Sequence, residues 1–153
     1  MNKNTAINLP RHVIWDWNGT LQDDVQAAVN GINLLLRQRN MPQVTVERHR
    51  ELFTFPVSIY YRELGFALEN ENWDALANTF INAFASDSSA KLFSSTVPTL
   101  ARFAAYGVPM SILSACQRSV LEGALDKNGI RGYFNTVKGL DDPNAHSKLN
   151  LAK

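Results

Sequence analysis

Three short strand-like runs, each leading into sequence with a helical period, constrain the fold of this chain most strongly. The runs span His12–Trp15, Val108–Leu113 and Phe134–Lys138. Short apolar runs bounded by turn residues are typical of buried strands. Strands that alternate with helices favour a parallel sheet with right-handed crossover connections. We therefore expect an α/β fold whose core is a parallel sheet of three strands.

A block of helical sequence separates the first strand-like run from the second. Apolar side chains recur at helical spacing over residues 25–36 and again over residues 73–84. A block of this length exceeds an ordinary connection between two neighbouring strands. We expect a core formed by residues 1–22 and 94–153, and a separate helical cap formed by residues 23–93.

Polar side chains follow the first two strand-like runs at the points where they end. Asp16 comes directly after the first run, and Ser114 comes directly after the second. Ligands of parallel α/β sheets bind outside the carboxyl ends of the strands, so both side chains should face one crevice. There a carboxylate can act as a nucleophile or a metal ligand, and Gly19 lets the backbone approach an anion closely. With Lys148 as a nearby positive charge, this pattern predicts an anion site.

Motifs at the same positions resemble those of the haloacid dehalogenase superfamily. Residues 16–21, Asp-Trp-Asn-Gly-Thr-Leu, are similar to its first motif, whose usual phosphatase form is Asp-x-Asp-Gly-Thr. Ser114 matches the Ser or Thr of the second motif, and Lys148 matches the lysine of the third. Residues 139–142, Gly-Leu-Asp-Asp, are similar to the approach to that lysine in phosphoglycolate-phosphatase-like members. The resemblance covers nearly the whole chain and implies a Rossmann-like core with an inserted helical cap.

The resemblance also implies a reaction, a cofactor and a set of site residues. It implies a Mg²⁺-dependent phosphatase-type hydrolase that acts on a small phosphorylated metabolite through an aspartyl-phosphate at Asp16. Mg²⁺ would bind the Asp16 carboxylate and the main-chain carbonyl of Asn18, and cap residues Phe55 and Pro56 would contact the substrate. The implied catalytic residues are Asp16, Asn18, Ser114 and Lys148. The implied phosphate-binding residues are Trp17, Gly19, Ser114, Ala115 and Lys148.

Asn18 departs from the phosphatase form of the first motif. The aspartate usual at this position protonates the leaving group and then activates water, which an amide cannot do. General acid–base catalysis contributes about a hundredfold to ten-thousandfold, so turnover of alkyl phosphates should fall by about that factor. An acyl phosphate, whose leaving group needs no proton, could tolerate Asn18.

A second departure concerns the fourth motif, an acidic pair that follows a fourth strand in the family. The sequence ends at Lys153 without it, and Asp141 and Asp142 precede the third-motif lysine instead of following it. One carboxylate alone should bind Mg²⁺ weakly. Because the missing strand would lie beside the first, we also expect self-association through the edge of residues 12–16.

Each candidate residue has a plainer interpretation. Residues 16–20 could form a turn whose aspartate caps the next segment. Ser114 could be an ordinary loop serine, and Lys148 a solvated helix lysine. For the whole chain, the alternative function is a catalytically inactive remnant, a fragment or a phosphate-binding module.

Composition bears on partners and compartment. Lys and Arg total 15 against 14 Asp and Glu, which gives no electrostatic reason to expect nucleic acid or a membrane as partner. Cys116 is the only cysteine, so no intrachain disulfide can form. Because the sequence has neither a secretory signal nor a membrane-spanning stretch, we expect a cytoplasmic protein.

Overall fold

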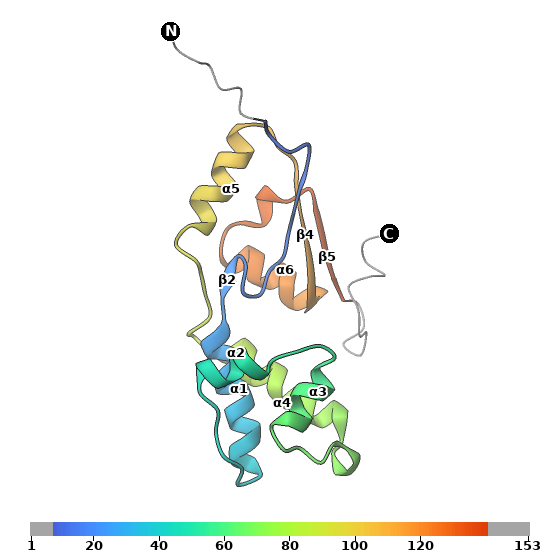
Figure 1. Cartoon of the computed structure of the whole chain (residues 1–153). Coiled ribbons are helices and arrows are strands. Elements are labelled where there is room, and N and C mark those ends of the chain that lie inside the picture. Colours follow the sequence, from blue (N-terminus) through green and yellow to red (C-terminus); the bar gives the residue numbers. More distant parts are fainter. Residues whose placement is uncertain (1–7, 141–153) are drawn as a thin grey trace. The chain divides into compact units, whose positions relative to one another are not determined.

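The computed structural model describes residues 8–140 and divides the chain into two compact units (Figure 1). One unit contains the chain up to Gln22 and again from Leu92, and we call it the core unit. The other unit, Asp23–Lys91, is called the helical unit. Two short strands, β2 (Gln22–Asp23) and β3 (Lys91–Leu92), pair with each other where the chain passes from one unit to the other.

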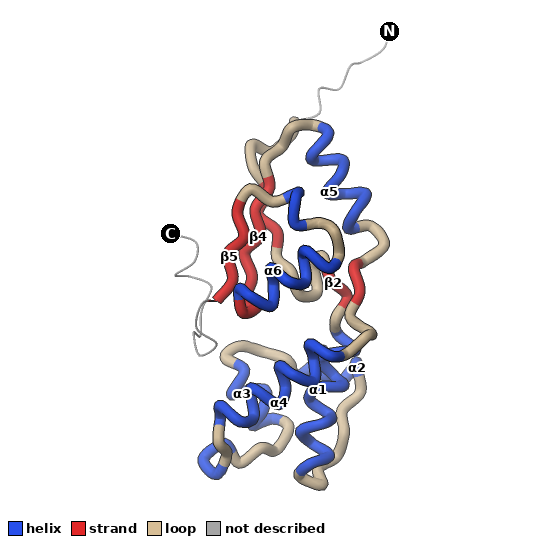
Figure 2. The backbone as a smooth tube through the Cα atoms, turned by 180° about the vertical axis from the view of Figure 1, so that it is seen from behind, coloured by secondary structure: helices blue, strands red, loops and turns tan. Residues whose placement is uncertain are grey.

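The core unit is built on a parallel three-stranded sheet, which confirms the predicted α/β class. Its strands are β1 (Val13–Trp15), β4 (Met110–Gln117) and β5 (Thr136–Leu140), in the order β1-β4-β5. Helix α5 (Thr96–Ala105) leads into β4, and α6 (Arg118–Lys127) with the 3₁₀ turn η2 (Arg131–Tyr133) connects β4 to β5. Figure 2 shows α6 alongside β4 and β5, the two strands that it contacts.

One face of this sheet carries the hydrophobic core. Along β4, Met110 and Ile112 are buried and alternate with half-buried residues, the pattern of a strand with one covered face. Leu121 and Leu125 of α6 are fully buried against this face, and each contributes roughly 1.5–3 kcal/mol of apolar burial. On β1, by contrast, the side chain of Ile14 is 66% exposed.

The helical unit has a hydrophobic core of its own. Its elements are α1 (Val25–Gln38), α2 (Val46–Leu52), α3 (Val57–Glu63), the 3₁₀ turn η1 (Leu68–Asn70) and α4 (Trp73–Ser86). Helices α1 and α4 approach closely at Gly31, where an added Cβ would lie 3.0 Å from the Phe80 ring. The buried residues are Ile32, Leu35, Leu36, Tyr60, Tyr61, Phe66 and Leu76. No helix within residues 8–140 is both long enough and apolar enough to span a membrane.

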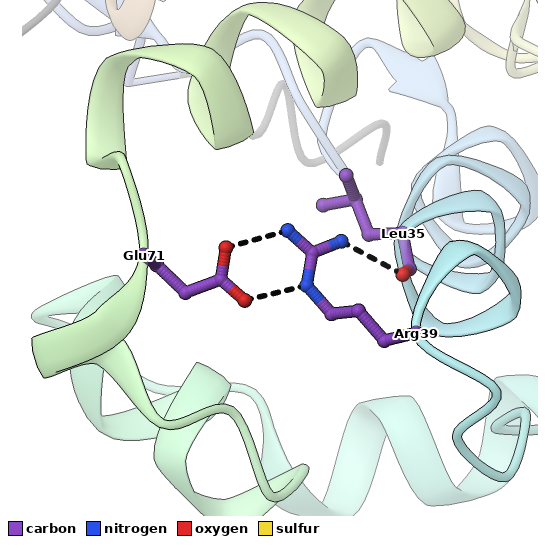
Figure 3. A network of polar contacts seen from close by, with 3 residues as sticks. All are labelled: Leu35, Arg39 and Glu71. Carbon is purple, nitrogen blue, oxygen red and sulfur yellow. Dashed lines mark hydrogen bonds and ion pairs between the residues drawn. The ribbon is translucent and has the colours of Figure 1, made fainter.

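An ion pair joins the end of α1 to the segment before α4 in the helical unit (Figure 3). Arg39 Nε and Nη2 each donate a hydrogen bond of 2.6 Å to the carboxylate of Glu71, and Nη1 donates to the carbonyl of Leu35. The guanidinium carbon also lies 5.2 Å from the centroid of the Phe66 ring. Hydrogen bonding to Arg39 lowers the pKa of Glu71. A partly buried bidentate pair of this kind contributes about 1 kcal/mol to stability.

The strands differ from the predicted ones mainly at their boundaries. We expected the second strand to end at Leu113, but β4 continues to Gln117 through an irregularity in its pairing with β5. The third strand begins at Thr136 instead of Phe134. Phe134 is buried in the core from the turn after η2, because burying an aromatic ring does not require strand pairing. The two-residue strands β2 and β3 are too short to have a detectable sequence period.

Candidate active site

The loop that follows β1 is a compact turn anchored by Trp17. The Trp17 side chain is buried in the core, and its carbonyl accepts hydrogen bonds from the N–H groups of Thr20, Leu21 and Gln22 at 3.0–3.2 Å. The Gly19 N–H donates to the carbonyl of Gln22 at 2.9 Å. Gly19 has a φ of +69°, a left-handed conformation that favours glycine. Nothing lies within 4 Å of a Cβ placed there, so the constraint is conformational instead of steric.

The register of the sheet brings this loop next to Ser114. Trp15 on β1 pairs with Ile112 on β4. Asp16 lies one position beyond this pair along β1, and Ser114 lies two positions beyond it along β4. Parallel strands end at the same edge of their sheet, as predicted from the sequence. The Asp16 side chain is half-buried and the Asn18 side chain is exposed. A carboxylate and a hydroxyl therefore lie on neighbouring strands at the edge where α/β proteins bind ligands.

The Ser114 side chain is buried and forms a hydrogen bond within its own strand, β4. Its side chain is 1% exposed, and its Oγ accepts a hydrogen bond of 3.0 Å from the N–H of Cys116. A serine hydroxyl carries one hydrogen and two lone pairs, so accepting this bond leaves its O–H for donation. The Ser114–Cys116 segment is therefore part of β4, within its irregular pairing with β5, instead of a free loop beyond the strand.

The other predicted site residues fall into three groups. Ala115 is half-buried beside Ser114 in the core unit. Phe55, which is 64% exposed, and Pro56 belong to the helical unit, where Pro56 precedes the first residue of α3. Lys148 lies outside the described residues.

The oxygen donors near Asp16 are of the type that Mg²⁺ prefers. The Asp16 carboxylate and the Asn18 main-chain carbonyl are hard ligands suited to this cation. Within residues 8–140, no three His, Cys, Asp or Glu side chains gather in one place. The described donors are therefore of the right kind for Mg²⁺ but few in number, and weak binding stays a prediction.

Two features of this edge have no clear signal in the sequence. A hollow of about 430 Å³ lies at the ends of β4 and β5, lined by Gln117, Arg118, Ser119, Glu122 and Leu140. Gly139 of β5 lies directly against the backbone that connects β4 to α6. The only sequence signal for Gly139 was its place in the Gly-Leu-Asp-Asp segment, which does not reveal its contact with residues more than twenty positions earlier.

Solved structures with this fold come from several bacteria. A haloacid dehalogenase-like hydrolase from Streptococcus pneumoniae matches with a TM-score of 0.72 at 16% identity, over 93% of this chain and 66% of the other. A protein from Lactobacillus plantarum, assigned as a phosphoglycolate phosphatase, matches with a TM-score of 0.77 at 16% identity, over 93% and 69%. Protein tyrosine kinase A from Mycobacterium tuberculosis matches with a TM-score of 0.76 at 20% identity, over 89% and 62%.

These structural matches bear on the fold alone, because proteins with different activities share it. The chain spans about two thirds of the length of these structures. No curated protein matched the sequence significantly. The family model for haloacid dehalogenase-like hydrolases, however, matches residues 13–149, which include β1, β4, β5 and the whole helical unit. The chain therefore belongs to the haloacid dehalogenase-like hydrolase family, as its motifs predict.

Proposed function

We propose that this chain is a phosphatase-type hydrolase that uses Asp16 as its nucleophile, Mg²⁺ as its cofactor and a small phosphorylated metabolite as its substrate. The observation that carries the proposal is the register of β1 and β4, with Asp16 and Ser114 just beyond paired residues of adjacent parallel strands. Family membership supports the same reaction class. In this proposal the helical unit acts as the cap, and Phe55 and Pro56 contact the substrate.

The proposed reaction proceeds in two steps. A carboxylate oxygen of Asp16 attacks phosphorus, the bond to the leaving oxygen breaks, and an aspartyl-phosphate forms. Water then hydrolyses this acyl phosphate and releases inorganic phosphate. Ser114 donates a hydrogen bond to a phosphoryl oxygen, and Lys148 neutralises part of its charge. Mg²⁺, when bound by the Asp16 carboxylate and the Asn18 carbonyl, neutralises further charge on the phosphoryl oxygens.

Asn18 narrows the class of substrate. A side-chain amide does not protonate an alkoxide leaving group, so alkyl phosphates are poor substrates in this proposal. The carboxylate that leaves from an acyl phosphate needs no proton. We therefore propose that acyl phosphates are turned over faster than alkyl phosphates.

A second candidate function is a phosphate-binding module without turnover. Asn18 is the observation that favours it. The amide removes the general acid–base group, while the main-chain carbonyl remains able to bind Mg²⁺ and the turn remains able to bind an anion. The hydrolase should turn over a phosphorylated substrate and the binding module should not, whereas both should bind phosphate.

The test is turnover of acetyl phosphate with Mg²⁺, comparing the natural chain with Asp16→Asn. Asp126→Asn, which changes an exposed aspartate on α6, is the matched control for the loss of one negative charge. We expect metal-dependent turnover by the natural chain and by the control, and none by Asp16→Asn. Equal background rates in all three folded proteins would reject the enzyme and leave the binding module.

A further inference from the structure

The pairing of β4 with β5 is irregular at the residues that form the proposed anion site. Leu113 pairs with Lys138, and the next pair is Gln117 with Leu140. Between these two pairs β4 has three residues, Ser114–Cys116, whereas β5 has only Gly139. Extra residues in one strand form a bulge, which bends that strand and redirects its side chains. The bulge therefore contains Ser114 and the residue whose N–H donates to it, Cys116.

Gly139 is where the sheet accommodates this bulge. A Cβ added to Gly139 would lie 2.7 Å from the Cys116 carbonyl oxygen, 2.7 Å from the Arg118 Cα and 2.9 Å from the Arg118 nitrogen. All three contacts are with backbone, which cannot rotate away as the end of a side chain can. Gly132, by contrast, has nothing within 4 Å of its added Cβ. Glycine inside a strand typically marks such a close approach of another backbone.

We infer that Gly139 is a positioning residue for phosphate, because its missing side chain allows the bulge that sets the direction of the Ser114 hydroxyl. The inference rests on the proposed function of the Ser114 segment as part of the anion site. A methyl group at Gly139 pushes the Cys116 carbonyl and the start of α6 away from β5. This displacement reaches Ser114 through the hydrogen bond from the Cys116 N–H.

The magnitude of the effect follows from the geometry. Displacement of a positioning group by about 1 Å can cost about a hundredfold in rate. Moving three backbone atoms from the distances found here to ordinary contact distances requires shifts approaching that size. A shift of this size breaks the hydrogen bond from Ser114 to a charged phosphate oxygen, so Gly139→Ala should weaken phosphate binding by roughly tenfold to a hundredfold.

Two control substitutions separate positioning from general loss of stability. Gly132→Ala adds the same methyl group to a glycine of the core unit where nothing stands in its way. Val137→Ala removes buried methyl groups from β5, so it destabilises the same strand without adding an atom near the bulge. If Gly139 had only a structural role, Gly139→Ala would behave as Val137→Ala does.

The experiment is a titration of the full chain and these variants with inorganic phosphate and Mg²⁺, followed through backbone amide resonances by NMR. We expect phosphate to shift the amides of Gly19 and of residues 115–118 in the natural chain. Phosphate affinity should fall for Gly139→Ala alone, in protein shown to be folded by its thermal unfolding transition. Equal affinities of Gly139→Ala and the natural chain would overturn the inference while leaving the proposed function intact.

The remaining outcomes are also decisive. No phosphate response anywhere in the natural chain would overturn both the anion site and this inference. If Gly139→Ala does not fold, the titration of the natural chain tests the inference about Gly139 instead. A joint shift of Gly19, Cys116 and Gly139 then supports the inference, and a shift confined to Gly19 overturns it.

Discussion

The hydroxyl of Thr96, the first residue of α5, donates a hydrogen bond of 2.8 Å to the carbonyl of Leu21, which follows the Asp16 loop. The same carbonyl also accepts from the N–H of Phe93 at 3.2 Å. Thr96 is buried, and 75 positions separate it from Leu21 in the sequence. Two residues of the segment that follows the helical unit, Phe93 and Thr96, therefore hold the end of the Asp16 loop in place by hydrogen bonds.

Thr96→Val tests how much the hydrogen bond from Thr96 to Leu21 contributes to stability. The substitution keeps the shape but removes the donor, and Leu21 retains its bond from Phe93. We therefore expect a loss of about 0.5–1.5 kcal/mol in the free energy of unfolding, measured by urea denaturation. Thr96→Ser keeps the hydroxyl and serves as the control. A Thr96→Val protein as stable as the natural chain would show that the bond is energetically neutral.

Asn18→Asp tests the assignment of the missing general acid–base group. The new carboxyl group restores the phosphatase form of the first motif, so turnover of glycerol phosphate should rise by about a hundredfold to ten-thousandfold. Acetyl phosphate, whose leaving group needs no proton, should gain much less. Asn18→Ala, which removes the amide without adding a carboxyl group, is the matched control. A parallel rise for both substrates would contradict the proposed preference for acyl phosphates and place the effect of position 18 in the hydrolysis of the aspartyl-phosphate, the step that both substrates share.

We expect His49 to make the stability of the helical unit depend on pH. Its Nδ1 shares a hydrogen bond of 2.7 Å with the Tyr60 hydroxyl, and its ring stacks on Phe53. Burial, with a smaller effect from the charge of Arg50, lowers the pKa of His49 below 6.5. Burial also raises the pKa of Tyr60 to about 12, so its hydroxyl stays protonated.

The direction of the pH effect follows from this lowered pKa. The unfolded chain binds a proton near pH 6.5, whereas the folded chain does so only at lower pH. Stability is therefore fully present above pH 6.5 and is lost as the pH falls towards the folded pKa, by at most about 1.4 kcal/mol per pH unit. Urea unfolding at pH 8 and pH 5.5 measures this loss. His49→Gln should show a smaller loss, and an unchanged pH dependence in that variant would exclude His49 as its source.

The substitution Ile14→Lys tests the predicted self-association of the chain. Strand β1 lies at one edge of the sheet formed by the described strands, and the Ile14 side chain is 66% exposed. An exposed apolar residue on an edge strand favours pairing with another chain. We expect light scattering to show concentration-dependent association of the natural chain and less association of Ile14→Lys. A natural chain that stays monomeric at high concentration would reject this prediction.

Local chemistry explains why much of the fold and part of the site were predictable. The turn at residues 16–20 follows from a short apolar strand ended by Asn-Gly, and Gly19 adopts the left-handed conformation that this turn needs. Helix α2 begins after Thr45, whose side chain accepts the Arg48 N–H at 3.2 Å, and α4 begins after Asn72 in the same way. Such signals act over a few residues and can be read from sequence.

The rest of the site depends on contacts between distant segments. The register that brings Asp16 beside Ser114 joins strands about one hundred residues apart, and the length of β4 depends on its pairing with β5. The donor to the Leu21 carbonyl comes from Thr96 on another helix. The strand-end positions of Asp16 and Ser114 predicted that both would face one crevice. The exact register, the full length of β4 and the bond from Thr96 have no local sequence signal, because they are set by how whole elements pack.

The sequence by itself determined the alternation of strands and helices, the turn at Asp16 and the family to which the chain belongs. These properties follow from side-chain type and spacing, which act locally. Only the tertiary structure decided that Ser114 lies in a bulge instead of a free loop, and that Gly139 is the residue making room for it. The physical reason is steric: two backbones can approach this closely only where the opposing strand has no side chain.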